Sequence, residues 1–364
     1  MDGVNEMDVN VSKQWNDWKW QLANRIESIE QLSQYVDLTP YEIDSIKSVS
    51  KQLRFAISPY YASLMDKGDP NCPLRKQMIP DIKELGDTIG VYDPKKEEKS
   101  LPVDCLFQLY PDRLVLYLTN QCPSYCRHCF RKRRIGKTDK DTSLNRIEKA
   151  IDYLKQATEI RDVLITGGDA LMVEDERLDY VLGEIRKIDH VQIIRLGTRT
   201  LCTLPQRITS NLAKIIAKHH PVWINTQINH PKEITKATAK ACDILLREGI
   251  PLGNQTVLLK GINDDSKTMK KLMHRLLEIR VRPYYIFHCH FVTGSTHFRT
   301  PLETGQEIIR DLQGFTTGFA VPRYAISTRI GKIPLDPNYV VSKDESSWTL
   351  RNYEGKNIEI PNSC

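Results

Sequence analysis

Short apolar runs alternate with amphipathic segments along the middle of this 364-residue chain. Six runs have the length and the Val, Ile, Leu and Tyr content of buried parallel strands, and they cover residues 114–119, 162–166, 191–197, 222–227, 254–259 and 282–289. Two intervening segments have clear helix starts: 143–157 follows a Ser cap, and 175–188 begins with acidic residues. Six β-then-α units in series predict an α/β fold, a partial (β/α)6 barrel over residues 105–300.

The two ends of the chain have other patterns. Residues 1–100 are mostly polar, and a Thr-Pro pair at 39–40 has the form of a helix start. Apolar residues at helical spacing precede it: Trp18, Leu22, Ile26 and Ile29. Residues 68–102 are rich in Pro, Gly and charge, which indicates an irregular connector, and 301–364 are irregular apart from β-like runs near the end. We therefore expect an N-terminal helical region, the barrel and a C-terminal segment.

Composition narrows the class of protein. A hydrophobic content of 40% can fill a core, and no run approaches the roughly 18 apolar residues of a membrane span. A net charge of +6 is mild for this length, so charge balance gives no argument for a nucleic-acid partner. The first residues, MDGVNEMDVNVSKQW, lack a basic stretch followed by an apolar run, so we expect no secretory signal and a reducing cytoplasm. Grouped cysteines in that compartment more often hold metal or do redox work.

Three of the nine cysteines follow the first expected strand directly. The stretch QCPSYCRHCFRKRRIG places Cys122, Cys126 and Cys129 at C-x3-C-x2-C spacing, with five basic residues from Arg127 to Arg134. The carboxyl end of a barrel strand is where such folds carry their chemistry. Structural zinc and ferredoxin clusters both take four protein ligands, so three thiolates leave one position open. We predict an iron–sulfur cluster with one exposed iron.

Other interpretations of this stretch remain. A zinc knuckle could use His128 or a distant cysteine, although His128 lies inside the C-x2-C loop and is poorly placed to join. The basic residues could form a solvated face or a nucleic-acid patch. Beside a cluster, we expect some of them to meet carboxylates or phosphates instead.

The triplet is the signature of the radical S-adenosylmethionine (SAM) enzymes, and the whole chain resembles the lysine 2,3-aminomutase family among them. The resemblance covers most of the chain and is carried by such stretches as WNDWKWQLANRI, YPDRL, CRHCFRKRRIG, RDVLITGGDAL, HPVWINT, IPLGNQTVLLKGIND, IRVRPYYIF and PNYVVS. It implies an isomerase, a 2,3-aminomutase that exchanges the α-amino group of an L-amino acid with a β-hydrogen to give a β-amino acid.

The resemblance also implies the first two cofactors. The three cysteines would ligate a [4Fe–4S] cluster whose open iron binds SAM, and an electron donor such as flavodoxin or ferredoxin would drive SAM cleavage to a 5′-deoxyadenosyl radical. In such enzymes the turn TGGD faces the methionine part of SAM, so Gly167, Gly168 and Asp169 are candidate SAM-binding residues. Glycine lets backbone approach a ligand closely, but the pair would suit an ordinary strand-to-helix turn equally well.

A third cofactor follows from the same resemblance. The family holds pyridoxal 5′-phosphate (PLP) on a lysine near the C-terminus, and TRIGKIPLDPNYV points to Lys332, which residue type alone would make an exposed charge. Arg113 in YPDRL matches an arginine that meets the PLP phosphate, or it pairs with Asp112 at a strand entry. Two departures suggest a differently seated PLP: a second phosphate-facing arginine is Leu109 here, and the glycine-rich run is about two residues shorter.

A structural zinc ion in the lysine enzymes uses a cysteine at the position of Cys242 and a C-terminal group of cysteines. Here Cys364 is the sole cysteine near that end. We predict no zinc, and we interpret Cys242 as a buried small apolar residue.

The substrate is inferred from three positions. Arg131 matches the arginine that pairs with the substrate α-carboxylate. The aspartates that receive the distal ammonium of lysine align with His290 and Ser327, neither of which is acidic. Burying an ammonium without a counter-ion is costly, so we expect a glutamate-like substrate, met by an imidazolium, or an amide or other polar side chain met by a neutral imidazole. Alternatively, His290 packs against Phe291 and the distal pocket lies elsewhere.

Two other functions are compatible with parts of the sequence. One is an L-lysine 2,3-aminomutase that makes β-lysine. The other is an iron–sulfur sensor that binds nucleic acid, which would explain the cysteines and arginines but neither the barrel pattern nor Lys332. We expect a small amino acid as the substrate, no nucleic-acid or membrane partner, and assembly as a homo-oligomer.

Overall fold

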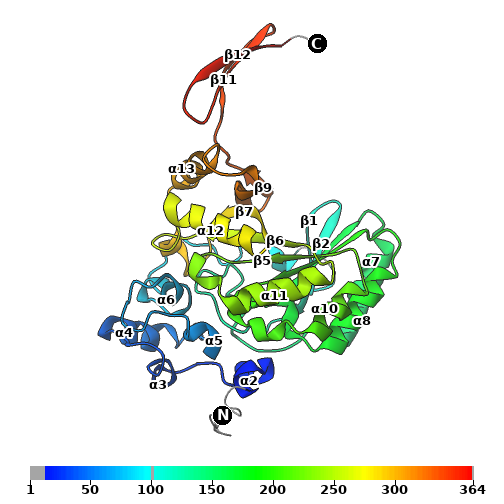
Figure 1. Ribbon diagram of the computed structural model, residues 1–364. Helices are drawn as coiled ribbons and strands as arrows, with labels where there is room; N and C mark the ends of the chain where they lie inside the picture. The colour runs from blue at the N-terminus through cyan, green and yellow to red at the C-terminus, as the bar shows by residue number, and fades with distance from the viewer. Residues whose placement is uncertain (1–12, 100–101, 363–364) are drawn as a thin grey trace, which may run out of the picture.

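Nine strands form one sheet in chain order, curved into a nearly closed barrel, in the computed structural model (Figure 1), which describes residues 13–99 and 102–362. The strands are β1 (Leu106–Tyr110), β2 (Arg113–Thr119), β3 (Asp162–Gly167), β4 (Ile193–Thr198), β5 (Val222–Thr226), β6 (Leu252–Leu258), β7 (Arg282–His288), β8 (Arg323–Thr328) and β9 (Gly331–Pro334). Strands β2 to β8 are parallel, while β1 and β9 are antiparallel edges. The six expected strands are confirmed as β2 to β7, and a seventh parallel strand, β8, extends the barrel.

Helices and short helical turns connect the barrel strands, and the longer helices pack on the outer face of the sheet. They are α7 (Leu144–Gln156), η3 (Ala170–Met172), α8 (Asp175–Arg186), α9 (Thr200–Thr203), η4 (Pro205–Arg207), α10 (Ser210–Ala217), η5 (Pro231–Glu233), α11 (Lys236–Arg247), α12 (Ser266–Glu278), η6 (Thr296–Phe298), α13 (Leu302–Leu312) and η7 (Gly318–Ala320). The expected helices are confirmed as α7 and α8, although the side chain of Ser143 makes no capping bond.

Alternation along each strand separates the two faces of the sheet. On β2 and β3, Leu114, Leu116, Val163 and Ile165 are buried in one core with the apolar faces of α7 and α8. The residues that alternate with them, such as Arg113 and Asp162, point to the inner face because successive side chains of a strand lie on opposite faces. The inner face of the barrel therefore carries polar as well as apolar side chains.

The two edges of the sheet meet through one hydrogen bond. The backbone N–H of Lys332 on β9 donates to the hydroxyl of Tyr110 on β1 at 2.8 Å. Between β8 and β9 the turn is only two residues long, and Gly331 has φ +120°, a conformation that a side chain would strain. Our expectation that this stretch is irregular was wrong, because the Pro and Gly residues lie in an edge hairpin rather than interrupting one.

The N-terminal region is helical, in short pieces: α2 (Trp18–Ala23), α3 (Ile29–Leu32), α4 (Pro40–Val49), α5 (Pro59–Ala62), α6 (Pro73–Met78), η1 (Ile82–Glu84) and η2 (Glu97–Lys99). Thr39 caps α4 in a capping box with Glu42, as the Thr-Pro pair predicts. The helical spacing across Ile26 was misleading, since Ile26 forms a β-bridge with Ile57 between α2 and α3.

This region packs against the loops at the carboxyl ends of the barrel strands. The backbone N–H of Ser58 donates a hydrogen bond to the hydroxyl of Ser124 at 3.0 Å, and the Ser58 hydroxyl donates to the carbonyl of Thr203 at 2.5 Å. The hydroxyl of Tyr61 donates to buried Glu233 at 2.8 Å. The N-terminal helices thus cover the end of the barrel where the cysteine loop lies.

A small separate sheet lies at the C-terminal end of the chain. Its strands are β10 (Val340–Lys343), β11 (Ser347–Arg351) and β12 (Asn357–Pro361), and it projects from the rest of the molecule beyond α13 (Figure 1). The β-like runs expected near the end are thereby confirmed. Within the part of the chain that is described, every helix falls short of the length and hydropathy that crossing a bilayer demands.

Candidate active site

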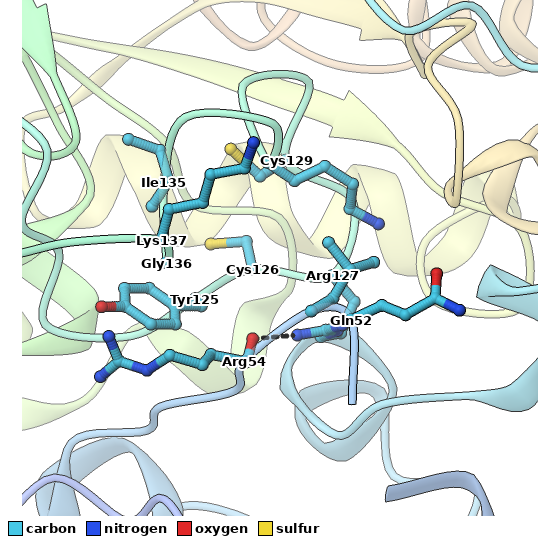
Figure 2. Close-up of a pocket in the computed structure, with 11 residues that line it drawn as sticks. Gln52, Arg54, Tyr125, Cys126, Arg127, Cys129, Ile135, Gly136 and Lys137 are labelled. Atoms are coloured by element: carbon cyan, nitrogen blue, oxygen red, sulfur yellow. Dashed lines mark hydrogen bonds between the residues drawn. The ribbon is translucent and has the colours of Figure 1, made fainter. Parts of the chain in front are cut away.

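The cysteine triplet lies in the loop that follows β2. Cys122, Cys126 and Cys129 are free thiols and partly exposed. Backbone hydrogen bonds fix the loop to the N-terminal region, from Tyr125 N–H to the Ala56 carbonyl at 2.8 Å and from Arg127 N–H to the Gln77 carbonyl at 2.8 Å. Figure 2 shows that the Cys126 and Cys129 side chains line one pocket, whose other wall comes from residues 52–54.

The donor set of this loop suits a cluster better than a single metal ion. Within residues 13–99 and 102–362, no three Cys, His, Asp or Glu side chains converge on one point. A cubane cluster does not require that, because each thiolate binds a different iron atom. Burial raises the pKa of Cys122, and raises that of Cys129 to about 11, so binding of iron has to displace protons from these thiols. The Sγ atom of Cys126 already accepts a hydrogen bond from Arg199 at 2.6 Å.

His128 does not join the cysteines. Its Nε2 atom lies 3.0 Å from the amide nitrogen of Gln227 and 3.3 Å from that of Asn229. Burial, and then the charges of Arg199 and Lys132, hold the pKa of His128 well below its usual value. The histidine is a neutral acceptor in a buried amide network, so the zinc-knuckle interpretation has no support from its position.

The TGGD turn after β3 approaches the cysteine loop closely. A Cβ atom on Gly167 would lie 2.2 Å from the Thr119 carbonyl oxygen, and one on Gly168 would lie 2.2 Å from that of Gln121. Both glycines are thus required by contact between two backbones of this chain. Whether they also face SAM stays a prediction.

Asp169 completes the turn as a buried acceptor. Its carboxylate accepts hydrogen bonds from the Thr198 hydroxyl at 2.6 Å and from the N–H groups of Arg199, Thr200 and Leu171 at 2.7, 3.1 and 3.1 Å. Because four protein donors already surround it, Asp169 connects the turn after β3 to the turn after β4. If Asp169 also contacts SAM, as predicted, SAM would have to bind a carboxylate that already accepts these four hydrogen bonds.

Four of the five basic residues between Arg127 and Arg134 are paired with acids of the irregular connector. Glu84 is fully buried and binds Arg127 at 2.7 Å and Lys132 at 3.1 Å. Glu97, equally buried, binds Arg131 at 3.1 Å and Arg133 at 2.9 Å. A nucleic-acid patch needs exposed cations, and these are covered. The alternative of a solvated basic face is wrong for the same reason.

Removing the acid from one of these pairs should cost much stability. In Glu84→Ala, the charges of Arg127 and Lys132 would stay buried without a counter-ion, so we expect a loss of about 3–5 kcal/mol in the free energy of unfolding. Thermal and denaturant unfolding would measure it. Glu98→Ala is the matched control, because that side chain is half exposed in its ion pair with Arg133 and should contribute less than about 1 kcal/mol. Equal effects in the two variants would contradict the prediction.

Arg131 is held by Glu97 with one end still free. Its Nε and Nη2 atoms donate to Glu97, while Nη1 makes no hydrogen bond to any residue that the structure describes. Burial opposes the charge of Glu97, but Arg131 and its other cationic neighbours lower its pKa to about 2. The carboxylate therefore stays ionised and orients the guanidinium, which leaves Nη1 for a ligand.

Lys332 lies on the inner face of the barrel. Its Nζ atom is 4.9 Å from the ring centre of Tyr285 and 5.3 Å from that of Phe287. Burial, followed by the nearby charges of Arg195 and Arg113, lowers the pKa of Lys332 to about 8. Lys332 is therefore no exposed surface charge. Arg195 was not among the residues that we expected from the sequence.

Arg113 lies at the start of β2, near Lys332. Its guanidinium is 4.0 Å from the ring centre of Tyr110 and 3.7 Å from Asp112, and its side chain is 41% exposed. The weak pairing with Asp112 and the stacking on Tyr110 leave its charge available to a ligand.

His290 and Ser327 approach the site from different strands. His290 follows β7 and stacks on Phe130, with ring centres 4.5 Å apart, rather than on Phe291. Burial, and then the charge of Lys95, hold the pKa of His290 well below its usual value, which favours a neutral imidazole over an imidazolium. Ser327 is the cross-strand partner of Lys332 in the β8–β9 hairpin, so the two side chains share a face.

Comparisons with known proteins agree with this geometry. The radical SAM superfamily model matches residues 116–276, and the lysine-2,3-aminomutase model matches residues 309–361. L-lysine 2,3-aminomutase of Clostridium subterminale is 48% identical over 94% of this chain and 83% of its own length. Glutamate 2,3-aminomutase of Clostridioides difficile is also 48% identical, over 96% and 83%. This chain belongs to the lysine 2,3-aminomutase family of radical SAM enzymes. Among solved structures the likeness is distant: Streptococcus suis SuiB bound to S-adenosylmethionine matches 55% of this aminomutase and 46% of its own chain, at 15% identity and a TM-score of 0.44.

Family membership confirms several expectations. The aminomutase is an isomerase with a radical SAM domain, and its family implies SAM and a [4Fe–4S] cluster as cofactors. The α/β barrel of radical SAM type is confirmed as well. The nucleic-acid-binding sensor loses its basis, since the cations that suggested it are buried in ion pairs.

The expected burial of Cys242 is also present in this aminomutase. Cys242 is fully buried on α11, and burial raises its pKa to about 12. Cys364 lies outside the described residues. The prediction that zinc is absent stays a prediction.

Proposed function

We propose that this aminomutase uses PLP and converts an α-amino acid with a non-cationic distal group, glutamate or a close analogue, to the β-amino acid. The observation that carries the proposal is the lack of a free acid beside the site. Glu97 is engaged by two arginines, and Asp162 by Arg195 at 2.8 Å. A distal ammonium would therefore find no unpaired carboxylate next to Arg131 or Lys332 among the described residues.

The residues around Lys332 fit PLP. A lysine whose pKa is about 8 has a sizeable neutral fraction near neutral pH, which a covalent bond to the cofactor aldehyde requires. Arg113 and Arg195 bring two positive charges close to Lys332, as a phosphate needs, although Leu109 replaces a third. When bound, PLP supplies a π system that can hold an unpaired electron next to the migrating nitrogen.

The chain's own residues would orient the substrate. We assign the α-carboxylate to Nη1 of Arg131, whose remaining donors are fixed by Glu97. Neutral His290, stacked on Phe130, and the hydroxyl of Ser327 would offer hydrogen bonds without charge. Cys122, Cys126 and Cys129 would hold the cluster, with Gly167, Gly168 and Asp169 as the proposed SAM-facing turn.

PLP attachment should follow the titration of Lys332. The neutral amine is the nucleophile, and its fraction rises from roughly a tenth at pH 7 to roughly nine tenths at pH 9 for a pKa of about 8. Borohydride trapping followed by mass spectrometry of the peptide that contains Lys332 should show an adduct that increases over this range and then levels off. An increase centred above pH 10, as for an ordinary lysine, would contradict this prediction.

Product analysis tests the substrate. Glutamate, glutamine, lysine and arginine would compete under anaerobic conditions with SAM, PLP and dithionite, and the β-amino acids would be separated by chromatography. We expect β-glutamate to predominate, with β-glutamine second. The rival is lysine, since the lysine and glutamate enzymes are equally similar to this chain at 48% identity. β-Lysine as the main product would overturn the proposal.

The remaining expectations stay predictions. They are a flavodoxin or ferredoxin as the electron donor, assembly as a homo-oligomer, and a cytoplasmic location. The three-part division of the chain at residues 100–105 and 300 is likewise a prediction.

A further inference from the structure

The connector between the N-terminal helices and the barrel is fastened to the loop that follows β7. Asp87 accepts hydrogen bonds from the N–H groups of Gly294, Ser295 and Thr296 at 2.8, 3.3 and 3.2 Å. Val91 forms a parallel β-bridge with Val292 four residues further on. These bonds hold the connector along the rim of the barrel and fix the direction in which the next residues continue.

Close packing strengthens this attachment. A Cβ atom on Gly90 would lie 2.6 Å from the backbone of Thr293, so the two segments are in direct contact. On the far side, Glu97 is bound by two arginines of the cysteine loop. The residues between Val91 and Glu97 are thereby fastened at both ends beside the site.

Lys95 extends from this fastened segment toward the candidate substrate residues. Its Nζ atom lies 4.6 Å from the ring centre of Phe130, the ring on which His290 stacks. Burial, and then the charge of Arg131, lower the pKa of Lys95 to about 7, and Lys332 is close enough to contribute. Arg131 lies over the same ring at 4.5 Å, so Lys95, Arg131 and His290 all meet at Phe130.

The ammonium of Lys95 has no partner of its own. Among residues 13–99 and 102–362 it makes no hydrogen bond and no ion pair, and it lies over the Phe130 ring. Glu97 favours its charge from a distance but is already bound by Arg131 and Arg133. A half-buried ammonium beside another cation is unfavourable alone and would be stabilised by an added carboxylate.

We propose that Lys95 is a specificity-determining residue that binds the distal carboxylate of an acidic amino-acid substrate. This inference rests on the proposed function, and it moves the positive charge from His290, where the sequence suggested it, to the connector. His290 and Ser327 then contribute hydrogen bonds to the same group. An acidic substrate would meet Arg131 at its α-carboxylate and Lys95 at the other end.

The test measures substrate binding before turnover. Wild type, Lys95→Met and Lys95→Arg, each loaded with cluster, PLP and SAM, would be titrated with glutamate and with glutamine without reductant. Lys95→Met keeps the side-chain length but removes the charge, so the Kd for glutamate should rise roughly 10- to 100-fold, while that for glutamine changes little. Lys95→Arg should restore part of the loss. Lys96→Met is the matched control, because the neighbouring Lys96 is exposed.

Turnover assays with reductant distinguish a failure of the Lys95 assignment from a failure of the proposed function on which it rests. With reductant, Lys95→Met should show a raised KM for glutamate, with 5′-deoxyadenosine still formed in the presence of glutamine. If wild type makes β-glutamate but Lys95→Met binds glutamate as tightly, the inference is overturned and the function stands. Equal losses for glutamate and glutamine would also overturn it, because they indicate a structural role. If wild type makes β-lysine instead, both fail.

Discussion

Replacing Cys126 with alanine should abolish the cleavage of SAM to 5′-deoxyadenosine. The loop after β2 offers three free thiols, and Cys126 and Cys129 line the same pocket (Figure 2). A [4Fe–4S] cluster with only three protein ligands has no thiolate to spare, and the nearby Cys202 is fully buried and donates to the carbonyls of Arg199 and Gln227. The variant should also lose most of its iron and its brown colour. Anaerobic assays with dithionite, together with iron analysis, would measure both.

Folding has to be checked, because Arg199 would lose a partner. Its Nη1 atom donates to Cys126, but Nη2 keeps Gln77 and Glu233, both at 2.5 Å. We therefore expect the circular dichroism spectrum to be retained. Cys242→Ala is the control: it removes a buried cysteine of α11 and should leave SAM cleavage intact. Full SAM cleavage by the Cys126 variant would remove Cys126 from the cluster site.

Replacing Lys332 with alanine should eliminate aminomutase activity while slow SAM cleavage continues. If Lys332 carries PLP, the variant should give no borohydride-stable adduct on the peptide that contains residue 332. Lys332 lies on β9 and is not one of the three proposed cluster ligands, so the cluster and its absorption should be unaffected. Mass spectrometry of the trapped protein and 5′-deoxyadenosine assays would report the two results separately.

The barrel should survive this substitution. Lys332 bonds Tyr110 through its backbone N–H, which alanine retains, so the contact between the two edge strands is preserved. Lys343→Ala is the control, since that lysine is exposed on β10 in the small C-terminal sheet. An adduct found on another lysine of the wild-type protein would refute the assignment.

The regular part of the fold could be predicted because its signal is local. A buried parallel strand favours a short run rich in apolar residues, and each of the strands β2 to β7 has one, although polar residues interrupt β4 to β6. Strands β8 and β9 have none, since Arg323, Ser327 and Lys332 alternate with apolar residues among Pro and Gly. The helical spacing of apolar residues near Ile26 predicted one continuous helix, but the backbone of Ile26 pairs with Ile57 instead, so the helix is interrupted there.

The candidate site likewise has a part that the sequence predicts and a part that it does not. The cysteine spacing is contained in eight residues, so it could be found in the sequence. The partners of the basic residues could not, because Glu84 and Glu97 come from a connector whose composition indicated only irregular structure. No local sequence pattern marks Lys95 as a site residue. Its position beside the site depends on Phe130 and His290, which are far from it in sequence.

The bond between Tyr110 and Lys332 joins residues 222 positions apart. During translation the ribosome releases the N-terminal helices, the cysteine loop and strands β1 to β7 before residue 332 is made. The inner face that surrounds Lys332 can therefore be completed only after strand β9 has been made. Nascent chains would present the three thiols of the cysteine loop well before Lys332, so this part of the barrel would be the last to form.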